Sequence, residues 1–288
     1  MSTTTNAPVF ASAVKPDRRP GIGGVARSEW TKIRSLRSTY WTFLVTAGLT
    51  IGLGSLFALG RTSGHASGRE AITANFNAAG FPFNALFLAQ LAIGVLGVLI
   101  ITSEYSSGMI RTTFTAVPQR GLVLAVKAVI FACVTLVVSV LTTFVTFFAS
   151  QAILNRGTVT AAPPHHLVKY GVSLSSPHAL RIVIGAALYM TVCALLGVAL
   201  GALLRSTAAA ITALAGLLFI LPIMMNFLPV SWHRDAIAQW LPSNAGMQII
   251  EKVTQPLQFS PWVGLAVFAG WVAVAFVAAL VLLRRRDA

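Results

Sequence analysis

The chain has 288 residues, of which 56% are hydrophobic and 10% are charged, whereas a soluble domain carries about 25% charged residues. Its charges are too few to cover a water-exposed surface, and intrinsic disorder is excluded because it requires low hydrophobicity. The 21 Lys and Arg residues outnumber the 7 Asp and Glu residues, but no zinc-finger spacing, RNP-like aromatic run or basic heptad helix supports nucleic acid as a partner. The class that is left is an integral membrane protein whose partner is the lipid bilayer.

Residues 1–21 are rich in Thr, Ala and Pro and are expected to form a disordered cytoplasmic tail. Residues 22–39 predict an amphipathic helix, because apolar and basic side chains separate onto opposite faces at about 100° per residue. The residues assigned to this helix are Glu29, Trp30, Lys32, Ile33, Arg34 and Arg37. Such a helix lies in the membrane interface with its tryptophan side chains at the headgroups. The alternative is a positively charged flank that only fixes topology.

Six apolar segments after residue 39 are long enough to cross the roughly 30 Å of membrane hydrocarbon, which takes about 20 helical residues. They cover residues 40–60, 83–102, 122–151, 182–204, 207–230 and 262–283. Their length and their Ala, Leu and Val content indicate helices, since transmembrane strands alternate over about 10 residues. The sequence therefore predicts an all-α integral membrane protein with six transmembrane helices and an N-terminal interfacial amphipathic helix.

Three features inside these spans carry expectations of their own. Lys127 lies near the start of the third span, where its ammonium group is expected to snorkel to the headgroups. Pro222 removes a backbone hydrogen bond from the fifth span, which predicts a bend or a break; a tolerated kink without a role is the alternative. Two Gly-x-x-x-Gly motifs, at residues 48–52 and 197–201, permit close approach of helices and are assigned to packing.

The distribution of Lys and Arg predicts the topology. With both termini on one side of the membrane, about two thirds of the 21 Lys and Arg residues fall on that side. Cytoplasmic loops carry such an excess, so we expect a multi-pass protein of the cell (plasma) membrane with both termini in the cytoplasm. The 5 histidines all fall outside and lack an HxxxH or HExxH spacing, so no metal site is expected.

The longest cytoplasmic connection joins the second and third spans, between Glu104 and Arg120. Glu104 lies at the end of a span, where an acidic residue is costly unless it is paired or hydrated. Gly108 permits a turn, and Pro118 ends any short helix that follows this turn. From these residues alone, the loop is either a docking element for a soluble partner or an ordinary connection in a helical hairpin.

The loop sequence Glu104-Tyr105-x-x-Gly108-Met109-Ile110-Arg111, followed by Pro118-x-Arg120, resembles the first cytoplasmic loop of ABC exporter permeases of the type-2 family. In that family the loop forms the coupling helix that touches the ATPase. Residues 29–38 look like the family's N-terminal elbow helix, and residues 240–246 look like the outer loop before its last span. The coupling-loop residues that the resemblance implies are Glu104, Tyr105, Gly108, Met109, Arg111, Phe114, Pro118 and Arg120. Met109 departs from the pattern, because Thr is more frequent at this position.

The resemblance implies the membrane subunit of an ABC exporter, with residues 40–288 as a permease domain for a hydrophobic or amphipathic substrate. We expect a separate ATPase subunit to bind ATP and Mg, since this chain has no G-x-x-x-x-G-K-[ST] motif. No cofactor and no catalytic residue is expected in the chain itself, which is therefore not expected to be an enzyme. The permease is expected to form a homodimer, or a heterodimer with a similar chain. The residues that bind substrate are unknown, and alternating access and lateral expulsion are both open.

Two other classes fit a six-span protein. A secondary carrier needs ionisable residues near the middle of the membrane, whereas the spans contain only Lys127, near an end. A membrane anchor or assembly factor without transport needs neither these residues nor an ATPase. Recovery of a nucleotide-binding subunit with the chain would separate the exporter from both alternatives.

Overall fold

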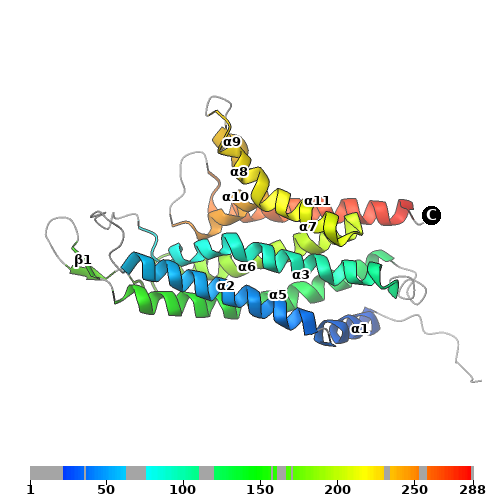
Figure 1. Cartoon of the computed structure of the whole chain (residues 1–288), viewed down its shortest axis with the longest axis horizontal. Coiled ribbons are helices and arrows are strands. Elements are labelled where there is room, and N and C mark those ends of the chain that lie inside the picture. The colour runs from blue at the N-terminus through cyan, green and yellow to red at the C-terminus, as the bar shows by residue number, and fades with distance from the viewer. Residues whose placement is uncertain are drawn as a thin grey trace, which may run out of the picture.

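The long helices lie side by side and run roughly along one shared axis (Figure 1). The computed structural model describes residues 22–35, 37–62, 76–109, 120–156, 158–160, 167–169, 171–229, 234–252 and 258–286. Within this part of the chain, six helices are long and apolar enough to cross a membrane. The predicted all-α membrane fold with six spans is thereby confirmed.

The interfacial helix and the six spans follow the predicted order along the chain, and two short strands that were not predicted lie between the third and fourth spans. Their bounds are α1 Ile22–Ser35, α2 Arg37–Thr62, η1 Phe81–Ala85, α3 Leu86–Ser106, α5 Arg120–Leu154, β1 Thr158–Thr160, β2 Leu167–Lys169, α6 Ala179–Leu204, α7 Thr207–Ala215, η2 Gly216–Ile220, α8 Leu221–Met225, α9 Arg234–Ala238, α10 Pro242–Met247, η4 Gln248–Ile250 and α11 Pro261–Arg286. The strands β1 and β2 pair as a short antiparallel hairpin. We call the end of the bundle that carries α1 and the C-terminus the α1 end; the hairpin lies at the opposite end (Figure 1).

The predicted boundaries differ from those of the structure by a few residues, and two of the differences matter for the site and for the fifth span. The interfacial helix was expected over residues 22–39, but α1 ends at Ser35 and α2 begins at Arg37, so Arg37 belongs to the first span. The fifth span ends at Met225 rather than at residue 230. The third span, α5, has 35 residues and is therefore roughly 50 Å long. It exceeds the hydrocarbon thickness, so it must tilt or extend into the interface.

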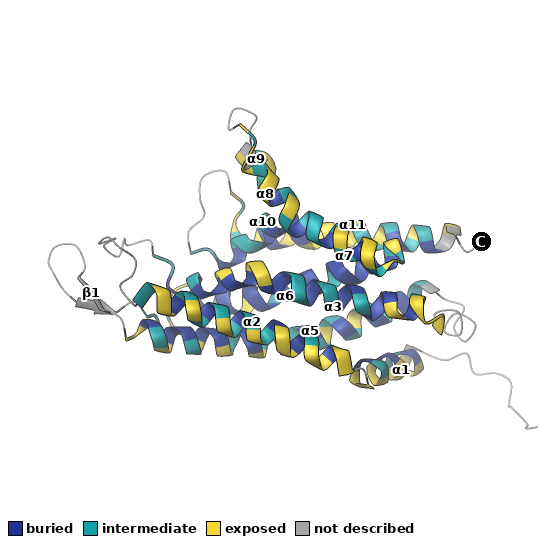
Figure 2. Ribbon diagram, viewed as in Figure 1, coloured by how far each residue is buried: buried dark blue, intermediate teal, exposed yellow. Residues whose placement is uncertain are grey.

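The centre of the bundle is the pair α3 and α6. In the most apolar part of each helix, 67% of α3 and 78% of α6 is buried, compared with 22% of α2 and α11. A Cβ atom on Gly97 would lie 2.1 Å from the carbonyl oxygen of Ala194, and one on Gly197 would lie 2.0 Å from that of Gly94. The backbones of α3 and α6 are therefore in direct contact, which only glycine permits. Figure 2 shows the buried residues concentrated along this central pair.

Only one of the two Gly-x-x-x-Gly motifs packs against another helix. The motif at residues 197–201 lies in the α3–α6 contact, as predicted for packing. Gly48 and Gly52 have no atom of the described chain within 4 Å of their Cβ positions. They lie on α2 beside exposed Leu44, Val45 and Leu56, a surface that an apolar solvent such as lipid would cover.

Pro222 widens the fifth span without breaking it. The segment η2, directly before Pro222, is a π-helical turn in which the Leu221 N–H bonds to the Gly216 oxygen five residues earlier. A wider turn gives room for the proline ring and for the carbonyl that the missing N–H leaves without a bond. The helix continues through Leu221–Met225 and leans away from the other spans (Figure 1).

Residues 240–250 fold back along the last span as a re-entrant segment. Trp271, ten residues into α11, donates its indole N–H to the Trp240 oxygen at 2.9 Å, which puts the tip of this segment roughly 15 Å along α11. At the other end of the segment, the Arg181 guanidinium donates to the carbonyl oxygens of Ile249 at 3.2 Å and Glu251 at 2.7 Å. Bonds at both ends therefore fix the segment between α6 and α11.

The α3–α6 contact predicts how two glycine substitutions differ. Gly197→Ala forces the backbones apart and should cost about 1–3 kcal/mol of stability, as overpacking does. Gly52→Ala is the matched control, because alanine there meets open space and has the higher helix propensity. Thermal unfolding in detergent measures both variants. Equal unfolding temperatures for the two variants would contradict the glycine contact.

Candidate functional site: a buried charge network at the α1 end

Four charged side chains from three helices meet at the α1 end of the bundle. Glu29 and Lys32 lie on α1, Glu104 lies in the last turn of α3, and Lys127 lies two turns into α5. We call these four residues the charge quartet. Glu29 reaches the interior because α1 packs against α5, and it shares its buried helix face with Val25 and Ile33, spaced four residues apart.

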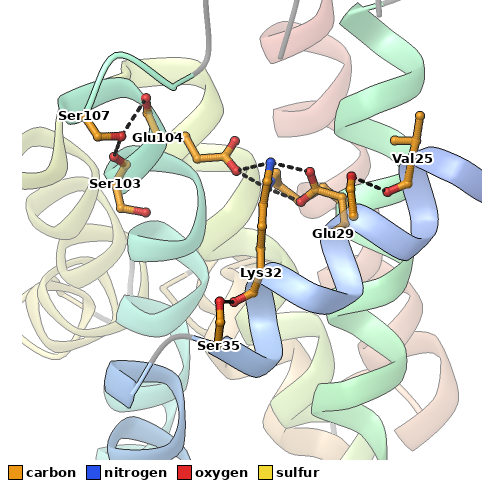
Figure 3. A network of polar contacts seen from close by, with 9 residues as sticks. Val25, Glu29, Lys32, Ser35, Ser103, Glu104 and Ser107 are labelled. Atoms are coloured by element: carbon orange, nitrogen blue, oxygen red, sulfur yellow. Dashed lines mark hydrogen bonds and ion pairs between the residues drawn. The ribbon is translucent and has the colours of Figure 1, made fainter. Parts of the chain in front are cut away.

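Each lysine of the quartet bridges both glutamates. Lys32 Nζ lies 2.8 Å from Glu29 Oε1 and 2.9 Å from Glu104 Oε1. Lys127 Nζ lies 2.8 Å from Glu104 Oε1 and donates a second hydrogen bond to Glu29 Oε2. Figure 3 shows Lys32 between the two carboxylates. The exposed fractions are 1% for Glu29, 7% for Glu104 and 4% for Lys127, whereas the Lys32 side chain is 27% exposed.

The pKa values of Glu29 and Lys32 favour the charged forms of these two residues. Burial alone would raise the pKa of Glu29, but the charge of Lys127 and hydrogen bonds from both lysines outweigh burial, so this pKa lies below its ordinary 4.5. Burial alone would lower the pKa of Lys32, but the bonds to Glu29 and Glu104 outweigh it, so this pKa lies above its ordinary 10.5. Two carboxylates and two ammonium groups make the quartet neutral overall.

A neutral quartet in which every charge has an oppositely charged partner offsets the energetic cost of charges in an apolar setting. Removing an ion from water costs several kcal/mol, and only close partners offset this cost. Such a network adds little net stability compared with apolar packing, but it strongly disfavours any arrangement that separates its members. Its effect is therefore to fix where α1 sits against α3 and α5.

The quartet lies on both sides of the connection between the second and third spans. Glu104 precedes residues 110–119, which fall outside the described part of the chain, and Lys127 follows them. Gly108 leaves the helical path with a φ of +71°, a conformation that glycine adopts without strain. Whatever residues 110–119 contact, the two helices that they join are bonded to each other and to α1.

A second contact joins Tyr105 to the other turn at the α1 end. The Arg205 guanidinium carbon lies 5.5 Å from the centre of the Tyr105 ring, within range of a cation–π interaction. Arg205 ends α6 in the left-handed conformation with a φ of +54°, and Ser206 then caps α7. The end of α3 is therefore tied to α1 and α5 through Glu104 and to the α6–α7 turn through Tyr105.

The predicted coupling-loop residues divide into described and undescribed groups. Glu104 and Tyr105 make the contacts given above, and Met109 is exposed after the Gly108 turn. Arg111, Phe114 and Pro118 lie outside the described residues. Arg120 begins α5, and nothing is described of its side chain.

The predicted interfacial-helix residues have more than one role. Ile33 is buried and Trp30 is exposed, so the apolar face of α1 is shared between the protein and its surroundings. Arg34 and Arg37 are exposed, the latter on α2. Glu29 and Lys32 belong to the quartet rather than to a solvated polar face.

The expectation that Lys127 snorkels to the headgroups is wrong. Lys127 is 4% exposed and bonds to Glu29 and Glu104. The snorkelling argument took the third span by itself, whereas in the structure α1 covers this face of α5. The available signal was electrostatic, because Glu104 at a span end requires a partner.

Comparison with models of known protein families gives no match for this chain. Comparison with curated proteins gives no significant match either. Among the described residues, no group of three or more His, Cys, Asp or Glu side chains is arranged to hold a metal ion.

The quartet predicts that losing its buried lysine costs more than losing its exposed one. Lys127→Met leaves Glu29 and Glu104 partly unpaired and should cost about 3–5 kcal/mol. Lys32→Met removes a group that water partly solvates and should cost less. Thermal unfolding in detergent compares the two variants. The double variant Glu29→Gln, Lys127→Met should lose less than the sum of its single variants, because it buries fewer unpaired charges; strict additivity would contradict the pairing.

The quartet also predicts a pH dependence. The pKa of Glu29 is lowered, so its contribution to stability is present above pH 4.5 and is lost as the pH falls through the lowered pKa. The pKa of Lys32 is raised, so its contribution is present below pH 10.5 and is lost as the pH rises through the raised pKa. Glu29→Gln should lower the unfolding temperature at pH 7 and flatten its fall in acid. An acid dependence that stays the same in this variant would count against a paired Glu29.

Proposed function

We propose that this chain is the membrane-spanning permease subunit of an ATP-binding cassette exporter. The proposal rests on the resemblance of residues 29–38 and 104–120 to the elbow helix and coupling loop of type-2 exporter permeases, within a chain of six apolar helices. The observation that carries it furthest is the charge quartet, which bonds the helices on both sides of residues 110–119 to each other and to α1. An element that receives force needs such a rigid base.

The proposed mechanism transmits motion from a separate ATPase to the spans. ATP and Mg bind to the ATPase, which pushes on residues 109–117 as its nucleotide-bound form closes. Glu104 and Lys127 lie in one bonded unit, so the push moves the ends of α3 and α5 together rather than bending the connection. Because α3 and α6 contact each other through glycines, the movement continues into the centre of the bundle. A homodimer, or a heterodimer with a similar permease, would then open a path for a hydrophobic or amphipathic substrate in the cell membrane.

A secondary carrier is the alternative with the most specific requirement. It needs an ion or proton site within the spans. In the described spans, Lys127 is held by two glutamates near the α1 end and Arg181 is held by backbone carbonyls near the start of α6. Both are used structurally and lie near span ends, which favours an exporter driven by an external ATPase. An anchor or assembly factor would show no dependence on an ATPase at all.

The exporter proposal predicts the effect of changes in the connecting loop. Phe114→Ala with Arg111→Ala removes an aromatic anchor and a charge that we assign to the ATPase contact, and aromatic anchors are worth about 2 kcal/mol or more. ATPase recovered with the affinity-purified permease should fall at least about tenfold, and export should be lost at normal permease levels. Thr112→Ala with Thr115→Ala is the matched control in the same loop.

Two results would contradict this prediction. Mass spectrometry of the wild-type protein, purified in mild detergent from its native membrane, should identify a partner with a Walker motif; recovery of no such partner would remove the exporter proposal. Undiminished recovery with the Phe114 and Arg111 variant would leave the exporter in place but remove the role of this loop.

The proposed topology predicts which positions a membrane-impermeant thiol reagent can reach in intact cells. The background needs Cys133→Ser, because Cys133 is exposed while Cys193 is buried. Cysteines placed at Ser2 and Ala288 should stay unlabelled until the cells are opened, and one at exposed Ser175 should react at once. Labelling of either terminal cysteine in intact cells would contradict the cytoplasmic termini.

A further inference from the structure

A cavity opens beside the charge quartet, between α1 and the end of α3. Its volume is about 400 Å³. Ile33, Ile100 and Met109 form apolar walls, and the hydroxyl-bearing residues Ser103 and Ser107 line it near Glu104 and Lys32. It therefore combines an apolar surface with a charged one at the level of the amphipathic helix.

Glu104 and Lys32, two of the four charged residues that line the cavity, each keep one unused hydrogen-bonding position. Glu104 Oε1 accepts from both lysines, while Glu104 Oε2 has no partner among the described residues although the side chain is more than nine-tenths buried; in Figure 3 the dashed lines from Lys32 end on one oxygen of each carboxylate. Lys32 donates two of its three N–H groups within the quartet, and its side chain is 27% exposed. One free acceptor and one free donor of opposite charge therefore lie side by side.

We propose that this cavity binds the headgroup of a zwitterionic lipid with a primary amine, such as phosphatidylethanolamine. The lipid ammonium donates to Glu104 Oε2, and its phosphate accepts from Lys32 Nζ and the Ser103 hydroxyl. The quartet is neutral, so a headgroup that carries both charges matches it, whereas a purely anionic headgroup leaves Glu104 Oε2 without a donor. A choline headgroup has no N–H to donate and is excluded by the same argument.

The surroundings of the cavity argue for a lipid rather than a soluble zwitterion. On α1 and the start of α2, Trp30, Tyr40 and Trp41 are exposed, and exposed tryptophan and tyrosine side chains mark the membrane–water interface. Inside the cavity, Ile33 and Ile100 give the first carbons of the acyl chains an apolar wall beside the charged groups. The inference does not depend on transport, so it stands if the exporter proposal fails, and the reverse also holds.

Native mass spectrometry of the delipidated, purified chain tests this inference. Phosphatidylethanolamine, phosphatidylcholine and phosphatidylglycerol with the same acyl chains are titrated separately. We expect phosphatidylethanolamine to bind at least about tenfold more tightly than either of the others, because only it makes both charge-assisted bonds. If phosphatidylcholine binds as tightly as phosphatidylethanolamine, the contact between the lipid ammonium and Glu104 is refuted. If phosphatidylglycerol binds as tightly or more tightly, the lipids are attracted only to a basic surface and the proposal is overturned.

Two variants locate the binding. Ser103→Trp fills the cavity without replacing a residue of the quartet and should abolish the preference for phosphatidylethanolamine. Ser106→Trp, in the same turn of α3 but outside the cavity lining, should keep it. Unfolding temperatures verify that both variants fold. If the preference persists in Ser103→Trp, the lipid binds elsewhere and the proposed site is wrong. If the wild type shows no preference, the proposal is refuted; this result is expected when a segment of the chain itself fills the cavity.

Discussion

Four paired charges at the α1 end fix how α1, α3 and α5 meet. Three of them are more than 90% buried, and a buried charge without a partner costs several kcal/mol. Each glutamate therefore needs a lysine from another helix, and no one helix can satisfy the quartet by itself. The interfacial helix is bound to the spans by this electrostatic requirement as much as by its apolar residues.

The charge quartet and the glycine contact hold two different levels of the bundle together. At the α1 end, bonds of 2.8–2.9 Å hold the starts and ends of three helices together. Deeper in the bundle, α3 and α6 touch backbone to backbone at Gly97 and Gly197, which leaves no flexible side chain to absorb a displacement. The fifth span differs from both, because its π-turn and Pro222 allow the helix to lean outward. A rigid centre with one deformable span suits a protein that changes shape in response to a push at its end.

Much of the fold could be predicted from the sequence because the membrane restricts it. A span must be apolar over about 20 residues and must satisfy its own backbone, so hydropathy alone located all six. The same physics does not say which helix covers which. Periodicity showed the apolar face of α1 but not that Glu29 on this face would meet Lys127, 98 residues away. Lys127 was expected to reach the headgroups because its partner could not be identified without the packing of α1.

The candidate site was predictable only in part, for a related reason. Glu104 was singled out as an acidic residue that needed a partner, and its local setting beside Gly108 was clear from the sequence. Its two lysines come from positions 72 residues before it and 23 residues after it, and no local pattern encodes such separations. The cavity beside it arises from the angle between α1 and α3, which depends on tertiary packing alone.

Hydrogen–deuterium exchange of the purified chain, wild type against Lys127→Met, tests the central claim most directly. If the quartet holds α1 to the bundle, the backbone amides of residues 22–35 will lose protection in the variant, while those of the α3–α6 centre keep it. Unchanged protection of α1 in a folded Lys127→Met protein would show that apolar contacts suffice and that the quartet does not hold this end of the structure.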